Sequence, residues 1–465
     1  MALSGARPGV PLMLERRLKL LEAVSLNMSM MVGIGPFITI PALVATMGGP
    51  QSMIGWVLGA AVALFDGMVW SELASAFPGS GGTYHFYDAA YGNSRSGRLL
   101  KFLFVWQFLF SGPLEVATGA IGLAKYLGYF YPKLAEPAWT WDALFPAFPG
   151  EVAWGQLAAM GVMAVVTCLA YRRVAVAGRL MVALWIGMLI TVAWVIVTGV
   201  THFDATLAFD FPDWTWGKGG LTRAGLGMAL AIAMYDFLGY YQICYLGDEV
   251  ANPSRTIPRS ILISVAVIAV VYLTMNIGIL GVLPWREVVS SKHIASDLML
   301  RVHGPRAAAL ATAMIIWTAL ASTYAALLGY SRIPYASARA GHFFKAFAQT
   351  HPTAHFPHRS LLLISGIATL ACLANLETVI QALLTSRILI QFVGQIVTVF
   401  YLRKKATGPA STYRMPLYPL PALLALSGWL FVFSTSEPVV LAYGLLSLLA
   451  GAAVFFFWNK AVATV

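Results

Sequence analysis

The chain has 465 residues, of which 59% are hydrophobic and only 11% are charged. Soluble domains carry about 25% charged residues, and a soluble protein of this length divides into several domains with polar surfaces. No stretch of this chain is polar enough for one such domain. The composition therefore excludes a soluble protein and predicts an all-α polytopic membrane protein.

Twelve apolar stretches predict twelve transmembrane helices. They cover residues 21–46, 51–77, 100–131, 152–170, 180–200, 224–247, 260–283, 307–331, 360–375, 378–402, 417–434 and 438–458. With the N-terminus in the cytoplasm, cytoplasmic segments hold 21 of the 30 Lys and Arg residues and external segments hold eight. Because cytoplasmic loops are rich in Lys and Arg, this bias places both termini inside, in a cytoplasmic membrane. The net charge of +11 then reports topology in a lipid bilayer and not a nucleic-acid partner.

Two of the twelve stretches are interrupted. The first contains Gly33–Phe37 (GIGPF), and the sixth contains Phe237–Tyr241 (FLGYY). Glycine frees the backbone, and proline removes a donor and clashes with the preceding helical turn. In lipid, the unpaired backbone groups of such a break are tolerated only inside protein or beside a polar cavity. Two breaks at matching places in two halves of a chain indicate a transport site near the membrane midplane.

Four further stretches carry a family resemblance. They are Glu72–Gly92, which contains ELA, FPGSGGTY and AYG; Asp248–Arg259 (DEVANPSRTIPR); Ser331–Gly341; and Arg414–Pro419 (RMPLYP). In this order and spacing they resemble the signatures of the amino acid–polyamine–organocation transporters. The resemblance extends over nearly the whole chain.

The resemblance implies a fold of two five-helix inverted repeats, made by spans 1–5 and 6–10, with helices 1 and 6 broken and two additional helices. We expect a cytoplasmic N-terminal segment at 1–20, a transport core at 21–402, and the last two helices with the C-terminus at 403–465. Substrate is expected between the two breaks, where the positive ends of half-helices suit a carboxylate.

The candidate substrate-binding residues lie at the breaks and on the third span. Tyr235 is included because its distance from Gly239 matches the family's gating aromatic. The full set is Gly33, Ile34, Gly35, Glu115, Tyr235, Asp236, Phe237, Leu238, Gly239 and Tyr240.

Buried carboxyl groups are the most informative of these candidates. A charged residue at the bilayer centre costs about 2.5–3.5 kcal/mol on insertion scales, so such residues mark functional sites. Glu115 and Asp236 are each predicted to pair with a substrate amine or to carry a proton. The alternatives are that Glu115 pairs with Arg387 or a backbone N–H, and that Asp236 caps its broken helix. Arg387 itself is expected near the outer end of the tenth span, extending its charge to the membrane surface.

Three coupling schemes follow from the sequence. The first is a proton carried by Glu115 or Asp236. The second is sodium, because Ser322 and Thr323 resemble a sodium-ligand pair in distant sodium-coupled members of the fold. The third is uncoupled exchange. Some proton-coupled relatives carry a lysine in the fifth helix, and the matching stretch here, 183–188, has none. No cofactor is expected.

The predicted function is secondary active transport of an amino acid or a polyamine by alternating access, proton-coupled or exchanging. The alternative is a sodium-coupled amino acid symporter. Gly33–Phe37 resembles the GxGPF of the family's polyamine-uptake branch, and Ser111–Glu115 resembles that branch's SGxxD, whereas Gln395 stands where the branch carries Glu. The small partner is thus an amine-bearing solute, and the oligomeric state stays open.

A membrane-embedded enzyme and a channel are the competing classes. An enzyme needs a metal or nucleophile constellation at helical spacing, and the eight His residues fall in loops or interfacial segments. A channel needs repeated carbonyl loops as a selectivity filter, and no such repeat occurs. The sequence therefore favours a transporter over both.

Overall fold

A computed structural model describes residues 18–79, 81–140, 151–171, 174–212, 222–352, 356–405 and 412–463, without the side chains of 174–183 and 458–463. Most of the predicted cytoplasmic N-terminal segment, 1–17, lies outside the described residues, as do Ser80 and the last two residues. The division into segments 1–20, 21–402 and 403–465 stays a prediction.

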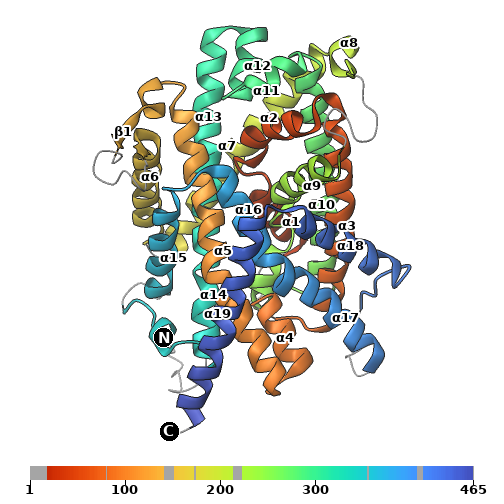
Figure 1. Ribbon diagram of the computed structural model, residues 1–465, viewed down its shortest axis with the longest axis vertical. Helices are drawn as coiled ribbons and strands as arrows, with labels where there is room; N and C mark the ends of the chain where they lie inside the picture. Colours follow the sequence, from red (N-terminus) through yellow and green to blue (C-terminus); the bar gives the residue numbers. More distant parts are fainter. Residues whose placement is uncertain are drawn as a thin grey trace, which may run out of the picture.

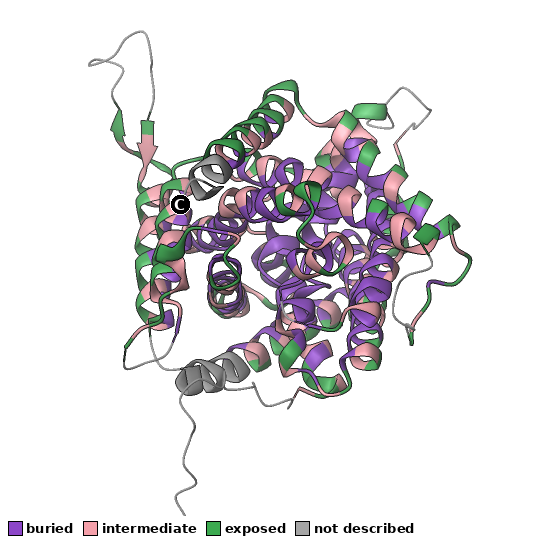
Figure 2. Ribbon diagram, turned by 90° about the horizontal axis from the view of Figure 1, so that it is seen from below, coloured by how far each residue is buried: buried purple, intermediate pink, exposed green. Residues whose placement is uncertain are grey.

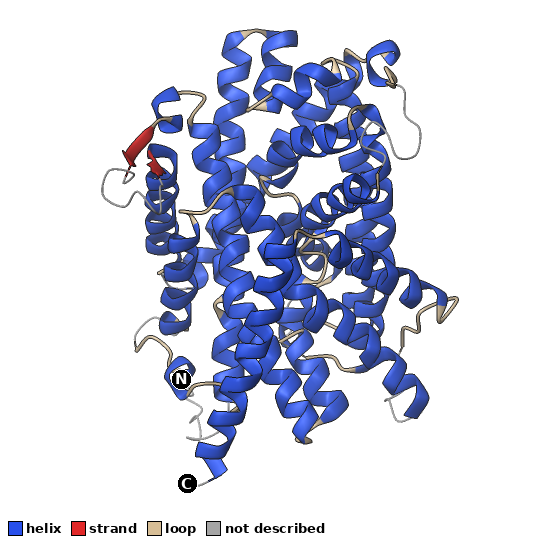
Figure 3. Ribbon diagram, viewed as in Figure 1, coloured by secondary structure: helices blue, strands red, loops and turns tan. Residues whose placement is uncertain are grey.

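α-Helices make up most of the described chain (Figure 3). They are α1 Leu20–Met31, α2 Gly35–Met47, α3 Met53–Ala76, α4 Thr83–Tyr91, α5 Arg95–Leu127, α6 Trp154–Ala170, α7 Val174–Thr201, α8 Ala205–Ala208, α9 Arg223–Phe237, α10 Pro253–Leu280, α11 Trp285–Ser290, α12 Ile294–His303, α13 Pro305–Tyr330, α14 Arg332–Arg339, α15 His358–Ala371, α16 Leu376–Arg387, α17 Gly394–Lys405, α18 Leu420–Thr435 and α19 Pro438–Ala463.

Short irregular elements join these helices. The 3₁₀ helices are η1 Pro50–Ser52, η2 Pro132–Ala135, η3 Gln242–Glu249 and η4 Lys345–Ala348, and a π-helical segment, η5 Ile388–Val393, joins α16 to α17. Two strands, β1 Pro137–Thr140 and β2 Glu151–Ala153, pair antiparallel at the edge of the molecule (Figure 3). Neither this hairpin nor η5 was predicted.

Each of the twelve predicted stretches contains an α-helix. In the described residues, seven helices are long and apolar enough to cross a membrane, and α1 with α2 makes an eighth span bent by 49°. Helices α6, α15 and α18 are shorter apolar helices, and α9 forms the first half of the sixth predicted span. The polytopic helical fold is thereby confirmed.

The first break is set by Pro36. Helix α1 ends at Met31, and α2 restarts at Gly35 with Pro36 in its first turn. Proline is tolerated there because that turn has no intrahelical acceptor for its missing N–H, but it disrupts a helix that tries to run through it. The chain therefore bends where the sequence predicted.

The second break is set by Gly239. Helix α9 ends at Phe237, Leu238 is extended, and Gly239 has a φ of +109° before η3 begins. A side chain at Gly239 would collide with Met30 and Met31 at the end of α1. Only glycine permits both this conformation and this close approach. The two breaks therefore pack directly against each other.

The broken helices occupy the buried centre of the bundle. Helices α1 and α9 lie in its interior, and α6 and α15 lie along one edge (Figure 1). Viewed along the bundle, buried residues fill the middle and exposed residues form the rim (Figure 2). The rim includes large apolar side chains such as Val270, Leu446 and Leu449, as expected for a surface that faces lipid. Helices α4 and α12 lie at opposite ends of the bundle (Figure 1).

Candidate substrate site

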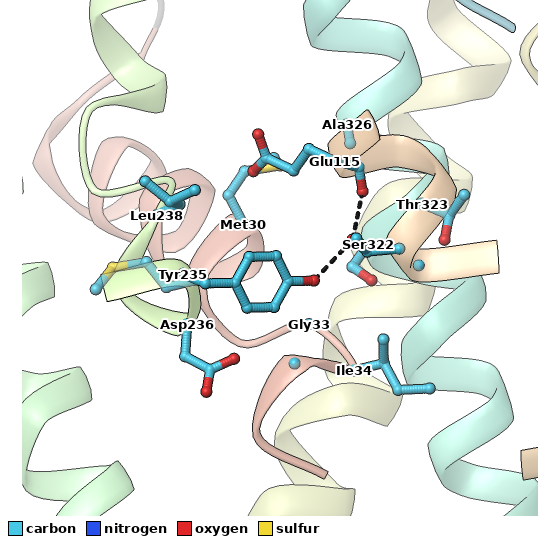
Figure 4. Close-up of a pocket in the computed structure, with 14 residues that line it drawn as sticks. Met30, Gly33, Ile34, Glu115, Tyr235, Asp236, Leu238, Ser322, Thr323 and Ala326 are labelled. Carbon is cyan, nitrogen blue, oxygen red and sulfur yellow. Dashed lines mark hydrogen bonds between the residues drawn. The ribbon is translucent and has the colours of Figure 1, made fainter. Parts of the chain in front are cut away.

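A small cavity lies where the two breaks meet. Its walls come from both breaks, from α5 and from α13 (Figure 4). The lining residues are Met30, Met31, Gly33, Ile34, Gly35, Glu115, Thr118, Gly119, Tyr235, Asp236, Leu238, Ser322, Thr323 and Ala326. Seven of the ten predicted substrate-binding residues thus surround one space.

The first break presents unused backbone donors. Val32 and Gly33 donate to carbonyls of α1, and Phe37 donates to Ile34. Within the described chain, the N–H groups of Ile34 and Gly35 have no hydrogen-bond acceptor. These groups form the positive end of α2, which favours an anion such as a carboxylate.

Asp236 supplies a carboxyl group directly opposite the first break. Its side chain is 2% exposed, and its Oδ1 has no hydrogen-bond partner in the described residues. A Cβ placed on Gly35 would collide with this Oδ1, so the absence of a side chain at Gly35 leaves room for the carboxyl. Asp236 and the free N–H groups therefore border the same narrow space (Figure 4).

The second oxygen of Asp236 contacts Thr39 of α2. Thr39 Oγ1 lies 2.5 Å from Asp236 Oδ2 and 3.0 Å from the carbonyl oxygen of Gly35, one turn earlier. The hydroxyl has one hydrogen and donates to only one of these acceptors. When Thr39 donates to Gly35, the short contact requires a proton on Asp236. This geometry accommodates both a carboxylate and a neutral carboxyl at position 236.

Glu115 has a different environment on the other side of the cavity. Its Oε2 lies 2.6 Å from Arg387 Nη1 and accepts a hydrogen bond of 2.6 Å from Tyr330. Arg387 is 0% exposed, donates to Ser111 and Tyr241, and lies beside the rings of Phe108 and Tyr330.

The expectation that Arg387 extends to the membrane surface is wrong. Position 387 falls at the end of α16, where η5 follows, inside the 30-residue helix Leu376–Lys405. An unpaired guanidinium at this depth would be costly, and the Glu115 carboxylate on α5 neutralises it there. Pairing with Arg387, the structural alternative for Glu115, is the arrangement observed.

Two hydroxyl groups link Tyr235, the neighbour of Asp236, to the backbone of Glu115. Tyr235 donates to Thr118 at 2.7 Å, and Thr118 donates to the backbone carbonyl of Glu115 at 2.7 Å (Figure 4). Ser322 and Thr323 line the cavity, and both donate to the carbonyl of Ala319 within α13. Their oxygens keep lone pairs for a further ligand. The sodium assignment for these two residues stays a prediction.

Three predicted substrate-binding residues do not line the cavity. Phe237 packs its ring against Trp56 and Tyr272, and Gly239 packs against α1. Tyr240 points away and donates to Asp66 of α3. These residues shape the second break from behind.

Two supporting residues were missed from the sequence. Tyr272 of α10 places its Oη 2.5 Å from the carbonyl oxygen of Met31 and 3.1 Å from that of Asp236. Its hydroxyl therefore lies within hydrogen-bond distance of a carbonyl near the C-terminal end of each broken helix. Asp66 is a fully buried acid in the second predicted span. Its presence in an apolar stretch was a detectable signal, whereas nothing local to Tyr272 marks its role.

Comparison with known proteins identifies the family. A model of the amino acid permease family matches residues 18–460. The chain belongs to the amino acid permease family. The permease is 24% identical over 461 residues to the serine/threonine exchanger SteT of Bacillus subtilis, covering 97% of this chain and 98% of that protein.

Two further relatives agree. The human cystine/glutamate transporter is 25% identical over 461 residues, covering 96% of the permease and 86% of that protein. The branched-chain amino acid permease BcaP of Bacillus subtilis is 25% identical over 461 residues, covering 96% of this chain and 94% of BcaP. The chain is therefore a membrane transporter of the amino acid–polyamine–organocation group and not an enzyme.

Proposed function

We propose that this permease moves an amino acid across the cytoplasmic membrane by alternating access, with the substrate held between the two breaks. The observation that carries the proposal is one cavity bordered, among the residues that the structure describes, both by backbone N–H donors without acceptors and by a carboxyl oxygen without a donor. Ile34 and Gly35 present free N–H donors, and Asp236 presents a free carboxyl oxygen. An α-amino acid carries a carboxylate and an ammonium group on the same carbon atom, which provides a partner for each.

The rest of the cavity suits a compact side chain. Gly119, Ala326 and Leu238 contribute small or apolar surface, and Met30 and Met31 contribute flexible thioethers. Thioether side chains adapt to irregular shapes, so this part of the cavity accommodates differing substrate side chains. The relatives named for serine, threonine, cystine, glutamate and branched-chain amino acids support the same substrate class.

A polyamine is less well matched. It has no carboxylate for the free N–H groups, and it needs several anionic partners for its amines. In the described cavity wall, Glu115 is already neutralised by Arg387. Gln395, at the position where the polyamine branch carries Glu, donates to Thr83 of α4 and does not line the cavity. These contacts favour a single amine beside Asp236.

Asp236 is also our candidate for a proton-binding group within the substrate site. Its contact with Thr39 accommodates a bound proton, and that proton competes with a substrate ammonium for the same carboxyl. Sodium at Ser322 and Thr323 is the alternative, since their free lone pairs are the hard oxygen ligands that such an ion accepts.

The proposal is tested with purified protein in liposomes by counterflow of a panel of amino acids and polyamines. Sodium and pH are varied separately. We expect counterflow of at least one amino acid and none of the polyamines. Counterflow of polyamines alone, or of no amine-bearing solute, would contradict the proposal.

A further inference from the structure

Asp66 is a buried acid outside the substrate cavity. It lies on α3, is 0% exposed, and is absent from the cavity wall. Tyr240 donates to its Oδ2 at 2.5 Å, and the indole N–H of Trp429 on α18 donates to its Oδ1 at 3.1 Å. The transport site described above does not use this group.

The Asp66 carboxyl has no cationic partner within the described chain. The side chains that hydrogen-bond to it are Tyr240 and Trp429. Helices α9, α10, α17 and α18 and the short η1 pack against α3. The titratable groups on α3 and these elements, besides Asp66, are Glu72, Arg223, Tyr235, Asp236, Arg255, Arg259, Tyr272, Tyr401, Arg403, Lys404 and Lys405, with none on α18 or η1. No ion pair joins any of them to Asp66.

The two hydrogen-bond partners accommodate Asp66 with or without a proton. As a carboxylate, Asp66 accepts from both Tyr240 and Trp429. As a neutral acid, it donates from Oδ2 to the hydroxyl oxygen of Tyr240 while Oδ1 still accepts from Trp429, because a phenol both donates and accepts. An indole N–H only donates, so Trp429 cannot serve a metal ion. The two partners therefore accommodate a proton on this carboxyl.

The same carboxyl connects three parts of the bundle. Tyr240 directly follows Gly239, the glycine that forms the second break. The neighbouring Tyr241 stacks on Trp70, one turn beyond Asp66 on α3, with ring centroids 4.4 Å apart. Trp429 stacks on Phe392 of η5 at 3.8 Å. A change in the hydrogen bond at Asp66 thus acts on the second break, on α18 and on the π segment after Arg387.

We propose that Asp66 is a proton-binding site that couples protonation to the position of the second break. The inference rests on the proposed transport function. A proton from water on one side binds Oδ2 and converts the carboxylate to a neutral acid, and Tyr240 changes from donor to acceptor. The same proton returns to water on the other side when the carboxyl re-ionises, so one positive charge crosses per cycle.

The test uses proteoliposomes with a transported amino acid and the membrane potential clamped at zero by valinomycin and equal potassium on both sides. With one proton per substrate, a gradient of one pH unit supports about tenfold accumulation in the wild type. Asp66→Asn keeps a donor toward Tyr240 and an acceptor for Trp429, so we expect normal counterflow at equal pH and loss of gradient-driven accumulation. Asp210→Asn, at an exposed acid paired with Arg286, is the matched control and keeps the tenfold accumulation.

Tyr240→Phe provides a second arm that leaves the carboxyl in place. We expect it to retain accumulation but to shift the pH of half-maximal accumulation upward, because the carboxylate loses a donor. Counterflow without any effect of the pH gradient in the wild type, tenfold accumulation by Asp66→Asn, or an unchanged pH profile in Tyr240→Phe would each overturn the inference. Absence of wild-type counterflow would instead contradict the transport function on which it rests.

Discussion

Glu115 and Asp236 are both carboxyl groups on the wall of one cavity, and the structure gives them different partners. Glu115 receives a guanidinium and a phenol, with Arg387 and Tyr330 both 2.6 Å from its Oε2. Asp236 receives one threonine hydroxyl, and its Oδ1 has no partner among the described residues. One acid is therefore part of an internally neutral cluster, and the other is available to a ligand.

The difference shows that burial alone does not set the role of an acidic residue in a membrane helix. Burial of the charge costs free energy at both residues. The partner supplied by a distant helix decides whether the charge is neutralised within the protein or is available to a ligand. Arg387 lies 272 positions from Glu115 in the chain, and Thr39 lies 197 positions from Asp236. Substitutions that remove the partner of Glu115, or that remove or displace the carboxyl of Asp236, test this comparison.

Removal of Arg387 should have the largest effect. Arg387→Leu leaves Glu115 without its cation, and breaking one partner of a buried pair costs about 3–5 kcal/mol. We expect a large fall in the thermal unfolding temperature of the detergent-solubilised protein. The double variant Glu115→Gln with Arg387→Leu removes both charges and should recover most of the loss. An Arg387→Leu protein as stable as the wild type would show that the pair is not structural.

Loss of the free carboxyl should come next. Asp236→Asn removes the anionic acceptor for the substrate ammonium, and a hydrogen bond to a charged group contributes about 1.5–3 kcal/mol, or roughly 10- to 100-fold in affinity. Binding is measured by ligand-induced thermal stabilisation or scintillation proximity. The Glu115→Gln, Arg387→Leu double variant is the control and should bind an amino acid much as the wild type does. The reverse ranking would exchange the roles assigned to the two carboxyls.

A smaller, steric effect is expected at the first break. Gly35→Ala places a methyl group against the Oδ1 of Asp236, which displaces the carboxyl from the free N–H groups. We expect weaker binding with little change in stability. Gly366→Ala on α15 is the matched control because a Cβ there meets no atom within 4 Å. Equal affinities for the two variants would contradict the close approach of Gly35 and Asp236.

The smallest effect concerns a polar cluster that contains neither Glu115 nor Asp236. His342 follows α14, contacts the Tyr84 hydroxyl, and lies 3.4 Å from the buried ammonium of Lys101, which pairs with Asp88. Burial, with Lys101 adding to it, lowers the pKa of His342 below its usual 6.5. The unfolded chain then binds this proton more readily than the folded one, so the stability contributed by His342 is present above pH 6.5 and is lost as the pH falls below it.

This prediction is measured as the unfolding temperature of the wild type minus that of His342→Gln. The difference should be more negative at pH 5.5 than at pH 7.5. A difference that does not change with pH would contradict a lowered pKa. The variant also separates the effect of pH on stability from its effect on transport.

The fold was predictable from the sequence to a considerable depth. Hydrophobic length gave the spans, and Pro36 and Gly239 gave the breaks, because these features act on their own segment of chain. The pairing of Glu115 with Arg387 was only one of several alternatives, because helical spacing does not say which faces of two distant helices meet. Tyr272 escaped for the same reason, since its role comes from a contact with Met31 on another helix. Asp66 was visible as an acid in an apolar stretch, but its contact with Tyr240 of the second break was not predictable.

The central claim is that the cavity binds the carboxylate and the amine of one amino acid on opposite walls. The most direct measurement is competition for binding among a transported amino acid, its carboxamide, the matching hydroxy acid and spermidine. The account predicts that only the compound with both groups binds with full affinity and that each single-group analogue is at least about tenfold weaker. Equal binding of the carboxamide or tighter binding of spermidine would contradict it.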